Sequence, residues 1–151
     1  MKNRNTQLTA VLFVVAFALA PVTKAAPSPE GGPDPAAALI TIHSTGDVTR
    51  GNTGSFVLDM KPALMLGGTY VNFKVSGTAV PGVDYVVLVS PSYIGQSGYG
   101  TLLVKTSPDP RASSSRQAYS VVVTLEAGPG YAVGAPSSAT MWIKPLSVGI
   151  R

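Results

Sequence analysis

Polar and apolar residues alternate along four stretches of the chain, and this period of two constrains the fold more than any other feature. Successive side chains of a β-strand point to opposite faces, so alternation makes one face apolar and leaves the other polar. A helix would instead repeat every 3.6 residues. The stretches are therefore predicted to be half-buried strands: SFVLDMK (55–61), TYVNFKV (69–75), YSVVVTL (119–125) and ATMWIK (139–144).

Less regular apolar runs at residues 39–43, 85–89 and 101–105 bring the expected number of strands to about seven. Between the runs lie turn residues, and the chain holds 16 Gly and 13 Pro, which fits frequent reversals of direction. Seven short strands with turns this dense predict an all-β fold. We expect a two-sheet antiparallel immunoglobulin-like sandwich.

The N-terminus has the pattern of a secretory signal peptide. Two basic residues among the first four precede an almost wholly apolar run at residues 8–20, and the small residues Thr23 and Ala25 follow. A helix over this run would be about 20 Å long, too short for the roughly 30 Å hydrocarbon core, which disfavours the alternative of an uncleaved anchor. We expect residues 1–25 to be removed and the protein to be secreted or held at the cell surface, with the periplasm as the other compartment.

After removal of this peptide, the sequence predicts two parts. Residues 26–37 (APSPEGGPDPAA) are rich in Pro and Gly, with little to bury, and are predicted to be a linker or a free arm. Residues 38–147 are predicted to be one sandwich domain. The chain has no cysteine and no second apolar run of transmembrane length, so we expect a product without disulfides and without a membrane-spanning segment.

The charge left after cleavage disfavours nucleic acid as a partner. Of eleven Lys and Arg residues, three precede residue 26, whereas all seven acidic residues follow it, so the net charge is +1 (8 − 7). Binding to a phosphate backbone needs clustered Lys and Arg. We therefore expect no nucleic acid partner.

Two segments resemble a known family. In VNFKVSGTAVPGVDYV (71–86) a strand ends, a Gly-Thr-Ala turn follows, and Gly-Val-Asp-Tyr begins the next element. In VVVTLEAGPGYAVGAPSSATMWI (121–143) a Gly-Pro-Gly-Tyr turn and Gly-Ala-Pro separate two strands. Both resemble the Calx-beta domain, an immunoglobulin-like sandwich of exchangers, integrins and bacterial surface proteins. The likeness covers residues 38–145 and implies the same fold.

The resemblance also implies calcium as a candidate cofactor, through carboxylates at one end of the sandwich. Asp84 matches one such position and Asp109 keeps part of a second, which makes these two the candidate metal ligands. A position where the family has Glu holds Arg50 here. Ca²⁺ needs 6–8 oxygen ligands, several of them charged, so the remaining set predicts a degraded site. The alternative for Asp84 is that it hydrogen-bonds the backbone of its own turn.

The inventory of reactive side chains disfavours catalysis. His43 is the only histidine, and we expect it to be solvated at a strand end. A triad needs a particular three-dimensional arrangement, and a carboxylate pair needs two acids about 5–10 Å apart in a cleft. The acidic residues are scattered among the turns. We expect no catalytic residues.

Binding through the surface is the more open prediction. On the alternation above, Tyr70 and Trp142 point away from the apolar faces and are candidates for contact with a carbohydrate or protein. Coverage of Trp142 by a loop or by the arm is the alternative. The apolar turn ALMLGG (63–68) either folds over the end of the core or meets a partner.

The arm itself suggests a different partner. An extended segment at residues 26–37 could add as a strand to the open edge of another copy, because edge strands present unpaired N–H and C=O groups. The alternative is an unstructured linker. The sequence thus predicts a non-enzymatic structural or adhesive module, with a protein, a glycan or a second copy as partner.

Overall fold

The strands predicted from the alternation are present, and the protein is all-β. The computed structural model describes residues 37–63, 67–108 and 117–146, and these contain ten strands and no helix. None of the described residues forms a helix that could cross a membrane. In chain order the strands are β1 (Ala38–Ser44), β2 (Val48–Thr49), β3 (Thr53–Lys61), β4 (Thr69–Val71), β5 (Phe73–Ser76), β6 (Ser92–Ile94), β7 (Tyr99–Lys105), β8 (Tyr119–Leu125), β9 (Tyr131–Val133) and β10 (Ser138–Lys144).

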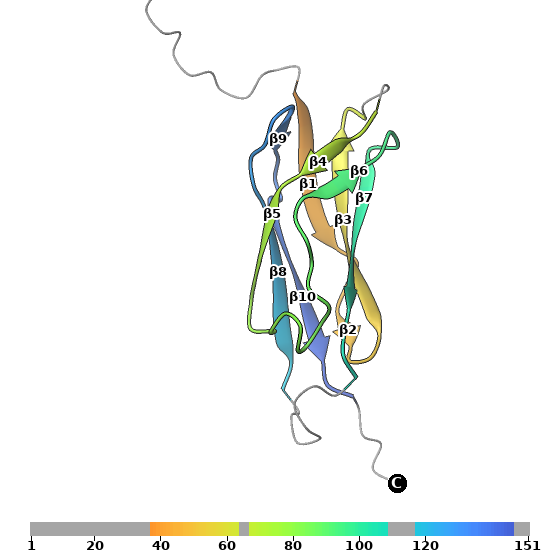
Figure 1. The fold of residues 1–151 in the computed structure, drawn as a ribbon, viewed down its shortest axis with the longest axis vertical. Coiled ribbons are helices and arrows are strands. Elements are labelled where there is room, and N and C mark those ends of the chain that lie inside the picture. The colour runs from red at the N-terminus through yellow and green to blue at the C-terminus, as the bar shows by residue number, and fades with distance from the viewer. Residues whose placement is uncertain (1–36, 64–66, 109–116, 147–151) are drawn as a thin grey trace, which may run out of the picture. The chain divides into compact units, whose positions relative to one another are not determined.

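The strands form two four-stranded sheets and a two-stranded one (Figure 1). The first sheet has the order β7-β3-β1-β9, the second β2-β10-β8-β5, and β4 pairs with β6 near one end. Most pairs are antiparallel, but β1 pairs with β9 and β10 with β2 in parallel. The predicted all-β fold is therefore confirmed, but the sheets are mixed rather than strictly antiparallel. Three short strands raise the number above the predicted seven, and they lie in stretches predicted to be turns or left unassigned.

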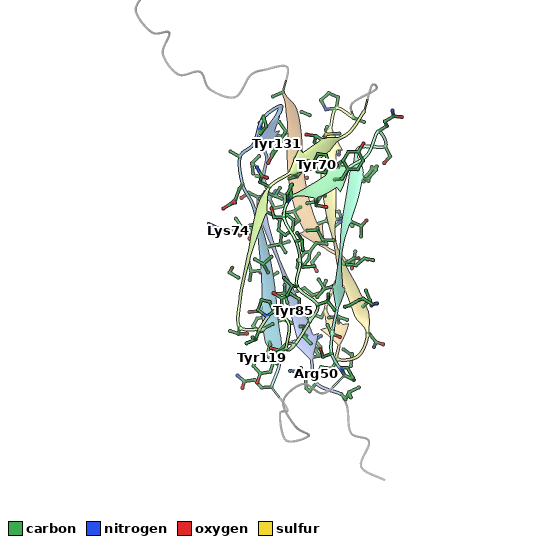
Figure 2. All side chains as sticks on the ribbon, in the orientation of Figure 1. Arg50, Tyr70, Lys74, Tyr85, Tyr119 and Tyr131 are labelled. Atoms are coloured by element: carbon green, nitrogen blue, oxygen red, sulfur yellow. The ribbon has the colours of Figure 1, made fainter. Side chains whose placement is uncertain are left out.

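One shared core lies between the two large sheets, as the alternation predicted. Buried side chains alternate along β3 and β8, and Met141 and Ile143 of β10 are fully buried with them. Full burial of an aliphatic or aromatic side chain stabilises the fold by about 1.5–3 kcal/mol each. Figure 2 shows that side chains fill the space between the sheets. The largest fully buried ones are Tyr85, Phe56, Ile40, Ile42, Leu58, Ile94, Met141, Ile143, Val71, Val104, Val121 and Val123.

Two of the predicted strands are corrected by the structure. The run 69–75 is not one strand, because it divides at Asn72 into β4 and β5, which belong to different sheets. Glu126 donates its N–H to the Asn72 carbonyl, while the Asn72 N–H bonds the Tyr131 hydroxyl, so the backbone changes partner there. The run 85–89 forms no strand, and only isolated bridges join Tyr85 to Pro81 and to Thr106.

The parallel strand β9 closes one edge of β1. Gly134 donates its N–H to the Ile40 carbonyl, and Ile42 donates to the Pro136 carbonyl, so the connection from β8 to β10 runs along β1. The backbone N–H and C=O groups of the even-numbered residues of β1 therefore point toward β9, and those of the odd-numbered residues point toward β3. The other outer edge of this sheet is β7.

Candidate functional site

A buried ion pair lies where the sequence predicted a degraded calcium site. The Nη1 atom of Arg50, directly after β2, is 3.3 Å from Oδ1 of Asp84, in the loop between β5 and β6. Arg50 is 5% exposed and Asp84 is fully buried. Two charges leave water at a cost of several kcal/mol each, and close pairing offsets that cost. The pair holds β2 against the loop that follows β5.

Backbone groups and an aromatic ring hold the pair in place. Val80 donates its N–H to Oδ2 of Asp84 at 2.7 Å, and the Asp84 N–H returns to the Val80 carbonyl at 2.8 Å, so Asp84 closes its own turn as one reading of the sequence predicted. The Arg50 guanidinium lies 5.1 Å from the centre of the Tyr119 ring. Figure 2 shows Arg50, Tyr85 and Tyr119 at the same end of the sandwich.

Burial also acts on Tyr85, next to Asp84 in the chain. Removal from water raises the pKa of the Tyr85 hydroxyl above its usual value, and the negative charge of Asp84 adds to the rise. Burial at this end of the core therefore favours the neutral form of the Tyr85 side chain.

This arrangement favours a structural role for Asp84. One of its carboxylate oxygens contacts a guanidinium, and the other accepts a backbone N–H. The described residues contain no group of three or more His, Cys, Asp or Glu side chains that could hold a metal ion. The second candidate ligand, Asp109, lies outside the described residues, so a calcium site that includes it stays a prediction.

The two outward aromatics lie on different sheets. Tyr70 is in β4 of the two-stranded sheet and Trp142 is in β10 of a large sheet. Figure 1 shows β4 near one end of the sandwich and the end of β10 near the other. The two side chains therefore do not form one platform.

Tyr70 instead has an aromatic partner that the sequence did not reveal. Tyr93 of β6 lies directly across from it, with ring centres 5.2 Å apart and planes at 53°. Both are exposed, at 64% and 52%. Tyr93 lies in a stretch predicted to be a turn, because the three residues of β6 are too few to show an alternating pattern. A side chain at Gly68 would overlap the Tyr93 ring, so this glycine lets the ring lie close to the backbone. We call Tyr70 and Tyr93 the tyrosine pair.

Trp142 is exposed on the outer face of its sheet, and its surroundings are polar. The backbone N–H of Trp142 donates to Oδ1 of Asp47 at 3.2 Å, and Oδ2 of Asp47 lies 2.8 Å from Nζ of Lys144. The hydrogen bond from Lys144, with that from the Trp142 backbone, lowers the pKa of Asp47. Ser120 lies across from Trp142 on β8. This indole therefore has a hydroxyl-bearing residue and an ion pair as neighbours.

His43 lies on the outer face of the other sheet and is about half exposed, close to the expectation of a solvated strand-end residue. Its Nδ1 atom is 3.8 Å from Oδ2 of Asp59, a neighbour on β3 that sequence spacing did not reveal. The distance is longer than a hydrogen bond. The pair is a surface ion pair when His43 is protonated, and such pairs contribute about 0–1 kcal/mol.

The fold and its surfaces define the class as an all-β sandwich whose outward side chains include aromatic, apolar, hydroxyl-bearing and charged groups. No family model matches the chain, and no curated protein is significantly similar to it. The resemblance to the Calx-beta domain therefore stays a prediction based on the motifs quoted above.

Proposed function

We propose that the protein is an exported, non-enzymatic structural or adhesive module that acts at the cell surface or outside the cell through contacts on its rigid outer surface. Export follows from the signal-peptide pattern, and the Calx-beta assignment from the two motifs at 71–86 and 121–143. The buried ion pair supports a structural role, since the carboxylate of Asp84 is engaged by Arg50 and by the backbone.

The tyrosine pair is the observation that carries this proposal. Two exposed rings on paired strands give a large contact area whose side chains lose little conformational entropy on binding. Strand pairing holds their backbones in register at Tyr70 and Tyr93. A protein or a glycan at the cell surface is the class of partner that such a pair fits.

Removal of the tyrosine rings tests the proposal. The double variant Tyr70→Ser/Tyr93→Ser is expected to bind at least about tenfold more weakly to the surface of the producing cells, because each ring carries about 1 kcal/mol or more of contact energy. The measurement is a titration of fluorescently labelled mature protein on intact cells, repeated after protease or glycosidase treatment of the cells.

Trp142→Ser is the matched control, since it removes one exposed aromatic from the opposite end. Loss of cell binding in this variant, with normal binding by the tyrosine variant, would favour the alternative of a carbohydrate-binding module that uses the indole. Unchanged binding by both variants would contradict an aromatic contact surface.

A further inference from the structure

Strand β7 presents an open edge. Its even-numbered residues pair with β3, whereas the Lys105 carbonyl accepts the N–H of Val86 at 2.9 Å on the opposite side. Odd-numbered residues of β7 therefore direct their backbone groups outward. Among the described residues, Thr101 and Leu103 have no hydrogen-bond partner on that side. Unpaired N–H and C=O groups in a row are a template for another strand.

The chain segment that could have closed this edge turns away from it. After Val86 the backbone leaves β7 and crosses toward the other sheet, where the Ser90 hydroxyl accepts the N–H of Phe73 in β5. Within the described chain, residues 87–89 make no backbone hydrogen bonds, and the side chains of Val87 and Val89 are exposed. The open edge is thus bordered by an uncovered apolar segment on the inner side of the sheet.

The N-terminal arm has the composition of a strand that pairs along one edge only. Its prolines are at 27, 29, 33 and 35, all odd positions, whereas every even position from 26 to 36 carries an N–H. Backbone groups of alternate residues in an extended strand point to opposite edges. One edge of the arm therefore has a full row of donors, and the other lacks most of them because proline has no N–H.

We propose that residues 26–36 of one copy add as an extra strand to the outer edge of β7 in a second copy. The inference deepens the proposed function and rests on it in one respect, that export removes residues 1–25. Antiparallel pairing through the donor-bearing edge places the two acids of the arm, Glu30 and Asp34, on the outer face of the sheet. Residues opposite each other share a face, so these acids lie on the same face as the side chain of Lys105. The prolines then face inward, toward the exposed valines of 87–89.

The other sheet edges fit the arm less well. Outward-directed backbone groups on β5 belong to Phe73 and Val75, whose side chains point into the core. An antiparallel arm paired there through its donors would turn Glu30 and Asp34 toward the interior, where burial of charge is costly. The remaining edge strands have two residues (β2) or three residues (β9, β4 and β6) each. Charge and length together select β7.

A second copy fits better than the arm's own sandwich. In the sheet order β7-β3-β1-β9, a chain leaving β1 must cross about three strand spacings, about 14 Å, to lie beyond β7. That crossing needs roughly four or five extended residues, so Asp34 would lie in the crossing segment and not beside β7. Both acids can lie along β7 only when the arm comes from another copy. Each copy carries one arm and one edge, so the contact can continue from copy to copy.

Adjacent glycines in the arm test the proposal. In mature protein that begins at Ala26, Gly32→Pro removes a donor from the pairing edge, and Gly31→Pro removes one from the edge that prolines already block. Sedimentation velocity over a concentration series should show self-association weakened at least about fivefold by Gly32→Pro and unchanged by Gly31→Pro. Equal effects of the two substitutions would overturn the pairing geometry, and a monomer at every concentration would overturn the second copy as partner.

A charge exchange tests the acceptor edge. Lys105→Glu should weaken association, and Glu30→Lys/Asp34→Lys in the same chain should restore it. Thermal unfolding of the dilute monomer should be similar for all variants, which separates an assembly effect from misfolding. No rescue would overturn the assignment to β7. The tyrosine pair is untouched in these variants, so cell binding and self-association can fail independently.

Discussion

Replacement of Asp84 by alanine is expected to lower the free energy of unfolding by about 3–5 kcal/mol, because it leaves the buried guanidinium of Arg50 without its partner carboxylate. The two side chains are almost fully buried and 3.3 Å apart, so solvent compensates little. The same change also removes the acceptor of the hydrogen bond that the Val80 N–H donates to Asp84. Urea unfolding followed by circular dichroism measures the loss.

The control is Asp47→Ala, which breaks an exposed ion pair with Lys144 and is expected to cost less than about 1 kcal/mol. A double-mutant cycle with Arg50→Met measures the coupling within the buried pair. The loss in the double variant should be at least about 1 kcal/mol smaller than the sum of the two single losses. Strict additivity would contradict direct pairing of Arg50 and Asp84.

Leu58→Ala is expected to destabilise the protein by about 2–5 kcal/mol, since it leaves a cavity in a core from which water is excluded. Leu58 is 0% exposed in the middle of β3. The matched change Leu39→Ala, at a side chain 45% exposed on β1, should cost less than about 1 kcal/mol. Equal losses at the two positions, from the same unfolding measurement, would contradict the assignment of faces on which the sandwich depends.

The long strands could be predicted from the sequence because each has a clear inner and outer face. The stripe from Phe56 to Met60 is buried as expected, and so are Val121 and Val123 of β8. Strands of two or three residues have no measurable period, so β2, β6 and β9 could not be predicted. Asn72 shows a second limit, because hydrogen bonds from distant residues divide one alternating run between two sheets.

The candidate site was predictable only where its contacts are local. The turn closed by Asp84 spans four residues and follows from the sequence. The pairing with Arg50 joins residues 34 positions apart, and the sequence predicted only that a cation near Asp84 would make a poor calcium site. The tyrosine pair depends on the register of β4 and β6, which the fold sets and spacing does not reveal.

The odd-numbered prolines and the open edge of β7 together explain how such a module could associate without aggregating. In the proposed strand addition, an arm with one blocked edge would complete the sheet of its neighbour and offer few donors to a third chain. Cell-surface adhesion through the tyrosine pair would then be multiplied by the number of joined copies, since linked binding sites raise the effective affinity.

Amide hydrogen exchange in β7, measured by NMR on mature protein at low and high concentration, tests the open edge most directly. In the dilute protein, Leu102 and Val104 should exchange slowly because they bond β3, whereas Thr101 and Leu103 should exchange fast. At high concentration all four should be protected. Thr101 and Leu103 amides that are slow in the dilute protein, or still fast in the concentrated one, would contradict strand addition at this edge.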